Sequence, residues 1–248
     1  KFKNKPLEQN VMLLGLSDSS KLTECLELFS DKLLLSAFEF FSLSCLRKVR
    51  SMRNVVEPFK EDYNYYALLE FDTNLINQAE NTFLDGLKAG ILNNGIISNS
   101  QAQANQLWSL RENITESISA FNPVKNDISL RISHIPIFLK DLKTYVKKFE
   151  EKIELCLFGH IGDGNIHINL LKASHLEYEE FLDITQEISE FSYKKIYEFG
   201  GSISAEHGVG LLKKDYLKYT RSEEEIRLMK GIKNTFDPHG ILNPGKIF

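Results

Sequence analysis

Two strand-like stretches joined by a tight turn constrain this chain more than any other feature of its sequence. Residues 153–171 are largely apolar, and Gly162-Asp-Gly164 interrupts them. Glycine and aspartate favour tight turns, so the turn can fold the chain back and bring His160 close to His167. Side chains alternate along a strand, which places Asn165, His167 and Asn169 on one face.

The pair of histidines around this turn predicts a metal site. Burying two imidazoles costs free energy unless each ring nitrogen finds a partner. Glu206 can add an oxygen ligand from Ser204-Ala-Glu-His-Gly-Val-Gly210, where glycine lets the backbone approach closely. His160, His167 and Glu206 would suit Zn, Mn, Fe or Co, and three protein ligands leave positions open, as in catalytic sites. The alternative is a pair of hydrogen-bonded core histidines and an exposed glutamate.

A second group of residues predicts an anion clamp. Trp108, Arg111 and Thr115 are three and four residues apart, so they share one face of an expected helix over residues 101–120. The guanidinium of Arg111 can bind a carboxylate in a bidentate way. Thr115 would add a hydroxyl, and Lys125 would add a second cation. The alternative is a surface helix with a snorkelling arginine.

Strand and helix patterns alternate along the chain, which predicts the α+β class. We expect a largely antiparallel sheet covered by helices, and the pattern alone leaves a parallel doubly wound sheet open. No Gly-x-Gly-x-x-Gly opens a helix after a strand, which disfavours the nucleotide-binding version of that alternative. The expected strands are residues 11–16, 33–41, 65–71 and 127–133 and the two halves of 153–171. The expected helices follow residues 17–20 and 72–74, cover 101–120, begin near Pro136, carry Phe181 to Phe191 and begin at Ser222.

Composition excludes some classes of protein. The net charge is −4 and the pI about 5.9, which argues against nucleic-acid binding. We interpret the basic cluster at residues 47–53 as a solvated surface segment. The three cysteines form no Cys-x-x-Cys pair, so they are expected to be small buried side chains in a reducing compartment. We find no signal peptide and no membrane-spanning run, and expect a cytoplasmic location, with peripheral attachment at the inner membrane as an alternative.

Five segments together resemble the C-terminal region of FAD-linked oxidases of the vanillyl-alcohol oxidase type. They are Ser36-Ala-Phe-Glu-Phe40, Leu107-Trp-Ser-Leu-Arg-Glu112, Gly159 to Asn169, Ser204 to Gly210, and Asn243-Pro-Gly-Lys246. That family includes cytochrome-linked D-lactate dehydrogenase, the glycolate oxidase flavin subunit and D-2-hydroxyglutarate dehydrogenase. Lys125-Asn-Asp-Ile-Ser-Leu130 resembles a run of the last branch, although Arg131 stands where that branch usually has proline.

The resemblance implies roles for individual residues. His160, His167 and Glu206 match the family's metal ligands, with zinc as the first expectation and manganese or iron as alternatives. His207 matches the residue that takes the hydroxyl proton, and Asn169 matches a polar substrate contact. Arg111, Thr115 and Lys125 match positions that bind the substrate's carboxylates.

The resemblance also implies an organisation and an activity. Residues 1–200 would form a ferredoxin-like cap domain that binds substrate, and 201–248 a helical segment returning to an N-terminal FAD-binding domain. The expected activity is FAD-dependent oxidation of a D-2-hydroxy acid, with a D-2-hydroxyglutarate-like dicarboxylate favoured and D-lactate or glycolate as the alternative. The electron acceptor would be a quinone, a cytochrome or an electron-transfer flavoprotein, and a homodimer is compatible. A metal-binding module without redox activity, or a metal hydrolase, is the competing class.

Overall fold

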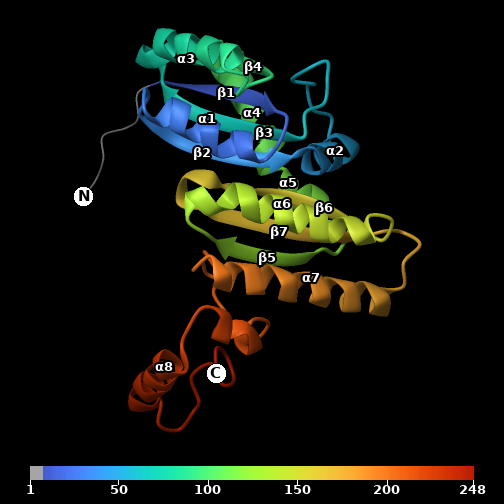
Figure 1. Ribbon diagram of the computed structural model, residues 1–248, viewed down its shortest axis with the longest axis vertical. Helices are drawn as coiled ribbons and strands as arrows, with labels where there is room; N and C mark the ends of the chain where they lie inside the picture. The colour runs from blue at the N-terminus through green and yellow to red at the C-terminus, as the bar shows by residue number, and fades with distance from the viewer. Residues whose placement is uncertain (1–7) are drawn as a thin grey trace.

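The computed structural model describes residues 8–248, and its strands form one antiparallel sheet of seven strands in the order β4-β1-β3-β2-β6-β7-β5 (Figure 1). Residues 1–7, which the domain prediction assigned to the cap, lie outside the described residues. The strands are β1 (Gln9–Leu16), β2 (Leu35–Ser42), β3 (Tyr65–Asp72), β4 (Asn94–Ile97), β5 (Val124–Ser129), β6 (Ile153–His160) and β7 (Asn165–Lys172).

Helices cover both faces of the sheet, which confirms the predicted α+β class. On one face α1, α3, α6 and α7 close an apolar core, and on the other α2, α4 and α5 close a second one. The helices are α1 (Ser20–Ser30), α2 (Leu43–Met52), α3 (Ile76–Lys88), α4 (Gln101–Glu112), α5 (Ile114–Ser119), α6 (Ile135–Val146), α7 (Tyr178–Glu198) and α8 (Glu223–Phe236). The parallel doubly wound alternative is excluded, because every strand pairing of the sheet is antiparallel.

The sheet consists of two halves that meet at a short seam. The order β4-β1-β3-β2 with α1 and α3 as connections is the βαββαβ arrangement of a ferredoxin-like unit, with α2 inserted after β2. Strands β6, β7 and β5 form the other half. Within residues 8–248, strands of the two halves pair only where Glu39 to Phe41 of β2 meet Phe158 to His160 of β6. The residues that pair across the seam therefore include two polar side chains, Glu39 and His160.

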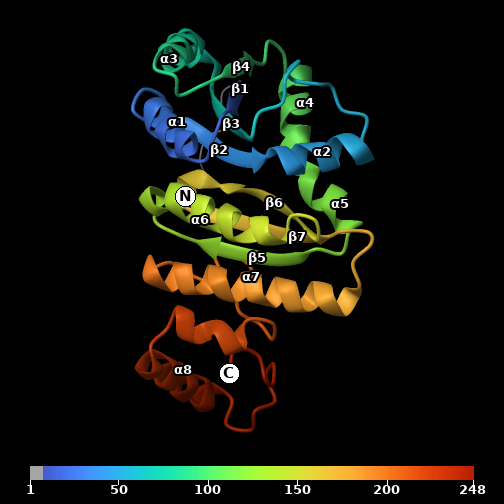
Figure 2. The same cartoon turned by 45° about the vertical axis from the view of Figure 1, so that its right-hand side comes forward.

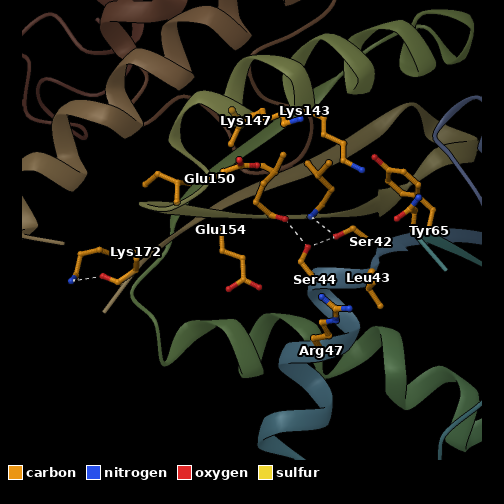
Figure 3. Close-up of a pocket in the computed structure, with 16 residues that line it drawn as sticks. Ser42, Leu43, Ser44, Arg47, Tyr65, Lys143, Lys147, Glu150, Glu154 and Lys172 are labelled. Atoms are coloured by element: carbon orange, nitrogen blue, oxygen red, sulfur yellow. Dashed lines mark hydrogen bonds between the residues drawn. The ribbon is translucent and has the colours of Figure 1, made fainter. Parts of the chain in front are cut away.

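A cleft opens where the strands of the seam diverge (Figure 3). It has a volume of about 760 Å³ and lies between α2 and α6. Ser42 Oγ accepts a hydrogen bond of 3.1 Å from the backbone N–H of Leu157, and Ser44 Oγ donates one of 2.6 Å to the carbonyl of Leu155. These hydroxyls satisfy backbone groups of β6 that β2 no longer reaches. We call this cavity the seam cleft.

The elements differ from the sequence prediction in four places, one of which is β4 (Asn94–Ile97), a short strand that the sequence analysis did not predict. The basic cluster at residues 47–53 belongs to α2, whose other face buries Cys45, Leu46 and Val49. The single helix expected over 101–120 is two helices that meet at Asn113. The strand expected at 127–133 begins earlier, at Val124, and ends at Ser129. The other predicted strands and helices are present with small shifts of their ends.

The C-terminal segment lies beyond α7, at one end of the molecule (Figure 2). Ser222 and Glu225 form the predicted capping box at the start of α8. No residue of α8 is buried, whereas Tyr216 and Tyr219, earlier in the segment, pack against Tyr193 of α7. Within residues 8–248, none of the helices combines the length and apolar character needed to cross a membrane. The three cysteines are buried and free, as predicted.

Candidate functional site

The tight turn predicted at Gly162-Asp-Gly164 connects β6 to β7. Gly164 adopts the left-handed conformation, with φ of +70°. A Cβ atom built on it would lie 2.0 Å from the carbonyl oxygen of Leu130, so glycine is required here for both backbone conformation and space. The turn places His160, at the end of β6, beside His167 of β7, with ring centroids 5.6 Å apart.

The three predicted metal ligands come together in space. Ligand atoms of His160, His167 and Glu206 all lie within 4.8 Å of one another, and His160 Nε2 is 3.8 Å from Glu206 Oε1. Burial lowers the pKa of His167 to about 4, so this imidazole is neutral at neutral pH and able to ligate a metal. Their role as ligands stays a prediction.

Glu39, which the metal and anion predictions did not include, links the two predicted groups. Its buried side chain pairs through Oε1 with His160 Nδ1 at 2.7 Å and through Oε2 with Arg111 at 2.9 Å. The hydrogen bond to Glu39 is the main reason why the pKa of His160 is raised. The only signal in the sequence was a glutamate inside the aromatic run of β2, within one of the segments that carried the family resemblance.

Asp127 of β5, also missed by the sequence analysis, holds the loop that carries Glu206 and His207. Its carboxylate is buried, and Oδ2 accepts hydrogen bonds from the backbone N–H groups of Ala205, Glu206 and His207 at 3.1, 2.8 and 2.9 Å. Burial acts to raise the pKa of Asp127, but these hydrogen bonds and two nearby histidines together lower it. Asp127, His167 and His207 also form a group with metal-ligand spacing.

Lys213 also holds this loop in place, through hydrogen bonds to two backbone carbonyls. Its buried ammonium donates hydrogen bonds of 3.0 Å to the carbonyl of Asp127 and 2.7 Å to the carbonyl of Ile203. Burial lowers its pKa. No local pattern around Lys213 marks this role, because both of its acceptors are backbone groups that only the fold brings near.

The anion clamp stays a prediction, and the structure shows that Arg111, Thr115 and Lys125 line the same cavity. Arg111 is buried, and its guanidinium lies 4.7 Å over the ring of Phe158, while Thr115 and Lys125 are exposed. Arg111 already has Glu39 as a partner, although its Nε has no hydrogen-bond acceptor. Trp108 does not join the clamp, because its Nε1 donates to Glu70 3.0 Å away.

One cavity collects the whole predicted site. It has a volume of about 270 Å³, and we call it the site cavity. Asn169 lines it from β7 and is buried, and its Nδ2 donates a 3.5 Å hydrogen bond to the carbonyl of Cys156. His207 lines it while remaining largely exposed. The lining residues are Arg111, Thr115, Lys125, Asn126, Phe158, His160, His167, Asn169, Glu206 and His207.

Comparisons with known proteins agree with this architecture. Residues 5–247 match the family described as FAD linked oxidases, C-terminal domain. The chain is 42% identical over 251 residues to a D-2-hydroxyglutarate dehydrogenase of Stutzerimonas stutzeri, covering 100% of this chain and 54% of that protein. It is 31% identical to a putative mitochondrial D-lactate dehydrogenase of Schizosaccharomyces pombe, covering 97% of this chain and 46% of that protein. The chain thus spans about half the length of these curated relatives.

A solved structure supports the fold at much lower sequence identity. Substrate-bound p-cresol methylhydroxylase superposes with a TM-score of 0.66 at 11% identity, covering 98% of this chain and 53% of that one. At this identity the likeness concerns the fold alone.

Proposed function

The chain belongs to the family of C-terminal domains of FAD linked oxidases, and from this premise we propose that it forms the substrate- and metal-binding half of a flavin-dependent D-2-hydroxy-acid dehydrogenase. The favoured substrate is a D-2-hydroxyglutarate-like dicarboxylate. The observation that carries the proposal is the site cavity, where a His-His-Glu group and two cations face the same small space. The relatives named D-2-hydroxyglutarate dehydrogenase support this choice of substrate.

The donor set of the cavity fits a divalent metal. Two imidazoles and one carboxylate within 4.8 Å of one another match catalytic zinc sites, which use three protein ligands and keep a position open. Manganese or iron would accept the same donors. When bound, such an ion supplies polarisation of the substrate's hydroxyl and carboxylate oxygens.

Residues of this chain would prepare the substrate for oxidation. His207, on the loop fixed by Asp127, would take the hydroxyl proton, since histidine transfers protons well near neutral pH. Arg111 and Lys125, with Thr115, would bind the distal carboxylate of the substrate. Asn169 would contact the end of the substrate that lies near the histidines. A bound flavin would supply the redox chemistry, as the hydride acceptor.

We further propose that residues 201–248 dock onto a flavin-binding domain of the longer protein. The relatives are about twice as long as this chain, and α8 exposes a row of apolar side chains without burying any residue. The exposed side chains of this segment include Leu228, Ile232, Phe236, Ile241 and Leu242. Replacing Ile232 and Phe236 by serine should make the full-length protein lose FAD more readily, and unchanged FAD retention would contradict the docking.

A specific observation favours D-lactate as the second candidate substrate. Arg111 is already paired with Glu39 at 2.9 Å, which leaves less of its charge for a distal carboxylate, and the Schizosaccharomyces relative is named as a D-lactate dehydrogenase. In this case Lys125 would be the free cation near the substrate.

The test compares substrates and metal content in the full-length protein. Chelation should remove most activity, and zinc should restore it. Turnover of D-2-hydroxyglutarate should exceed that of D-lactate. Full activity in a demonstrably metal-free protein would refute the metal role, while faster turnover of D-lactate would favour the second candidate.

A further inference from the structure

Each of the two predicted metal-binding histidines has a buried carboxylate beside its Nδ1 atom. For His160 the carboxylate is Glu39, and for His167 it is Asp127. Neither acid belongs to the His160, His167 and Glu206 group itself. The two histidines come from adjacent strands, β6 and β7, and the two acids come from the flanking strands, β2 and β5.

Glu39 is hydrogen-bonded to His160 and ion-paired with Arg111, although its Oε2 meets no donor with hydrogen-bond geometry. Glu39 is 7% exposed, so its charge depends on neighbours for stabilisation rather than on water. Oε1 lies 2.7 Å from His160 Nδ1 and Oε2 lies 2.9 Å from Arg111. The Nδ1 atom of His160 must therefore carry a proton, because a carboxylate oxygen can only accept. This leaves Nε2, the atom that faces Glu206, as the free lone pair of the neutral ring.

Asp127 stands in a similar position toward His167. Its Oδ2 is committed to three backbone N–H groups of residues 205–207. Its Oδ1 is buried without a hydrogen-bond partner and lies 3.6 Å from His167 Nδ1. A buried acceptor without a partner costs free energy, and a small shift of the His167 ring would supply an N–H donor. Because Oδ2 is occupied and Oδ1 faces Nδ1, Asp127 is placed to orient His167.

We propose that Glu39 and Asp127 are positioning residues that fix the tautomers of His160 and His167 and direct both Nε2 atoms toward one divalent ion. Metal-binding histidines commonly donate their second ring N–H to a carboxylate, which orients the ring and raises its basicity. The inference rests on the proposed metal function of the site cavity. Glu39 also connects His160, at the proposed metal site, to Arg111, where the distal carboxylate of the substrate would bind.

Zinc and cobalt affinity test this role without relying on activity. The metal-free full-length protein is titrated with Zn²⁺ against a chromophoric chelator, and with Co²⁺ for its visible spectrum. Glu39→Gln and Asp127→Asn should each weaken Zn²⁺ binding by about 10- to 100-fold and change the Co²⁺ bands. Both substitutions nearly preserve the size of the side chain, and the amide oxygen of the Asp127→Asn variant can still accept from the backbone of residues 205–207.

Double-mutant cycles separate positioning from a simple effect of charge. If Glu39 acts through His160, Glu39→Gln should weaken binding little further in a His160→Ala background. The same holds for Asp127→Asn in a His167→Ala background. Equal losses with and without the histidine would mean that the carboxylates act as distant charges, and would overturn the proposal.

Asp237→Asn provides the matched control. Asp237 is also a buried carboxylate, it accepts from the backbone N–H groups of Ile241 and Leu242, and it lies outside the site cavity. Its loss should affect thermal stability and leave Zn²⁺ affinity unchanged. If the parent protein binds neither ion, the proposed metal function fails and the positioning role falls with it. If the parent binds zinc and both variants bind it equally well, the positioning role alone is overturned.

Discussion

The seam cleft is the larger of the two cavities, but the site cavity holds the groups that could bind a metal and a substrate. The seam cleft has a volume of about 760 Å³, and the site cavity about 270 Å³. In an unfamiliar structure the largest cavity is the usual first hypothesis for a binding site. Here the smaller cavity gathers the histidines, the carboxylate and the cations from separate segments of the chain. Size alone would have selected the other region.

The two cavities also differ in whether the polar atoms around them have hydrogen-bond partners. At the seam cleft, the hydroxyls of Ser42 and Ser44 are bonded to β6, and Lys172 donates to two carbonyls, those of Ala173 and Leu176. At the site cavity, Arg111 Nε, Glu39 Oε2 and Asp127 Oδ1, which lies beside His167, are buried and have no hydrogen-bond partner. Polar atoms that a fold buries without satisfying call for an explanation such as an unseen ion or ligand.

Removing a metal ligand should give the largest effect and test this comparison most directly. In His167→Ala the affinity for the ion should fall, so that the purified protein holds little metal, and kcat/KM should drop by about 10³-fold, or several kcal/mol of transition-state stabilisation. The fold should survive, because the neutral ring is replaced by a smaller neutral side chain. Elemental analysis and steady-state kinetics on the full-length protein measure both. A variant that keeps its metal and its activity would remove the chemical distinction between the cavities.

The turn that shapes the site cavity offers a matched pair of glycines. Gly164→Ala would put a side chain on a residue with φ of +70° and against the Leu130 carbonyl, and would disturb the hydrogen bond from the Leu130 N–H to Gly164. We expect a loss of about 2–4 kcal/mol in the free energy of unfolding. Gly162→Ala meets no atom within 4 Å and should change it by less than about 0.5 kcal/mol. Denaturant unfolding of both variants measures this, and an equally small loss in Gly164→Ala would show that the turn does not require glycine at position 164.

The anion end of the site cavity should show its effect as a change in substrate preference. Arg111→Ala should lower kcat/KM for D-2-hydroxyglutarate by about 10- to 150-fold, the value of roughly 1.5–3 kcal/mol for a charge-assisted contact. D-lactate has no second carboxylate, so its kcat/KM should fall much less. Arg111→Lys is the control, because it keeps a cation beside Glu39 and loses only the bidentate geometry. An unchanged ratio between the substrates would show that Arg111 serves Glu39 and His160 rather than a distal carboxylate.

The sequence predicted what depends on local patterns and missed what depends on distant partners. Apolar periodicity was enough for most helices and strands, and two motifs placed His160, His167 and Glu206 around one site. The sequence analysis missed α2, because its many basic residues leave only a narrow apolar stripe, formed by Cys45, Leu46 and Val49. Glu39 and Asp127 belong to no recognisable sequence motif. Their roles can be inferred only from the folded structure, where a neighbouring strand places a histidine beside each of them.

Substitutions in the seam cleft should have the smallest effect, and unchanged activity would support the contrast between the two cavities. Lys147 is exposed just after the end of α6 and lines the cleft opposite Arg47 of α2 (Figure 3). Lys147→Ala removes a solvated charge, so kcat/KM should stay within about twofold and stability within about 0.5 kcal/mol. Lys143→Arg is a companion variant, because Lys143 lies 5.6 Å over the Tyr65 ring and arginine keeps that cation. If either variant changed the kinetics or the affinity for an anionic ligand, the larger cavity would be functional too. The contrast in buried, unpartnered polar atoms would then no longer distinguish the two regions.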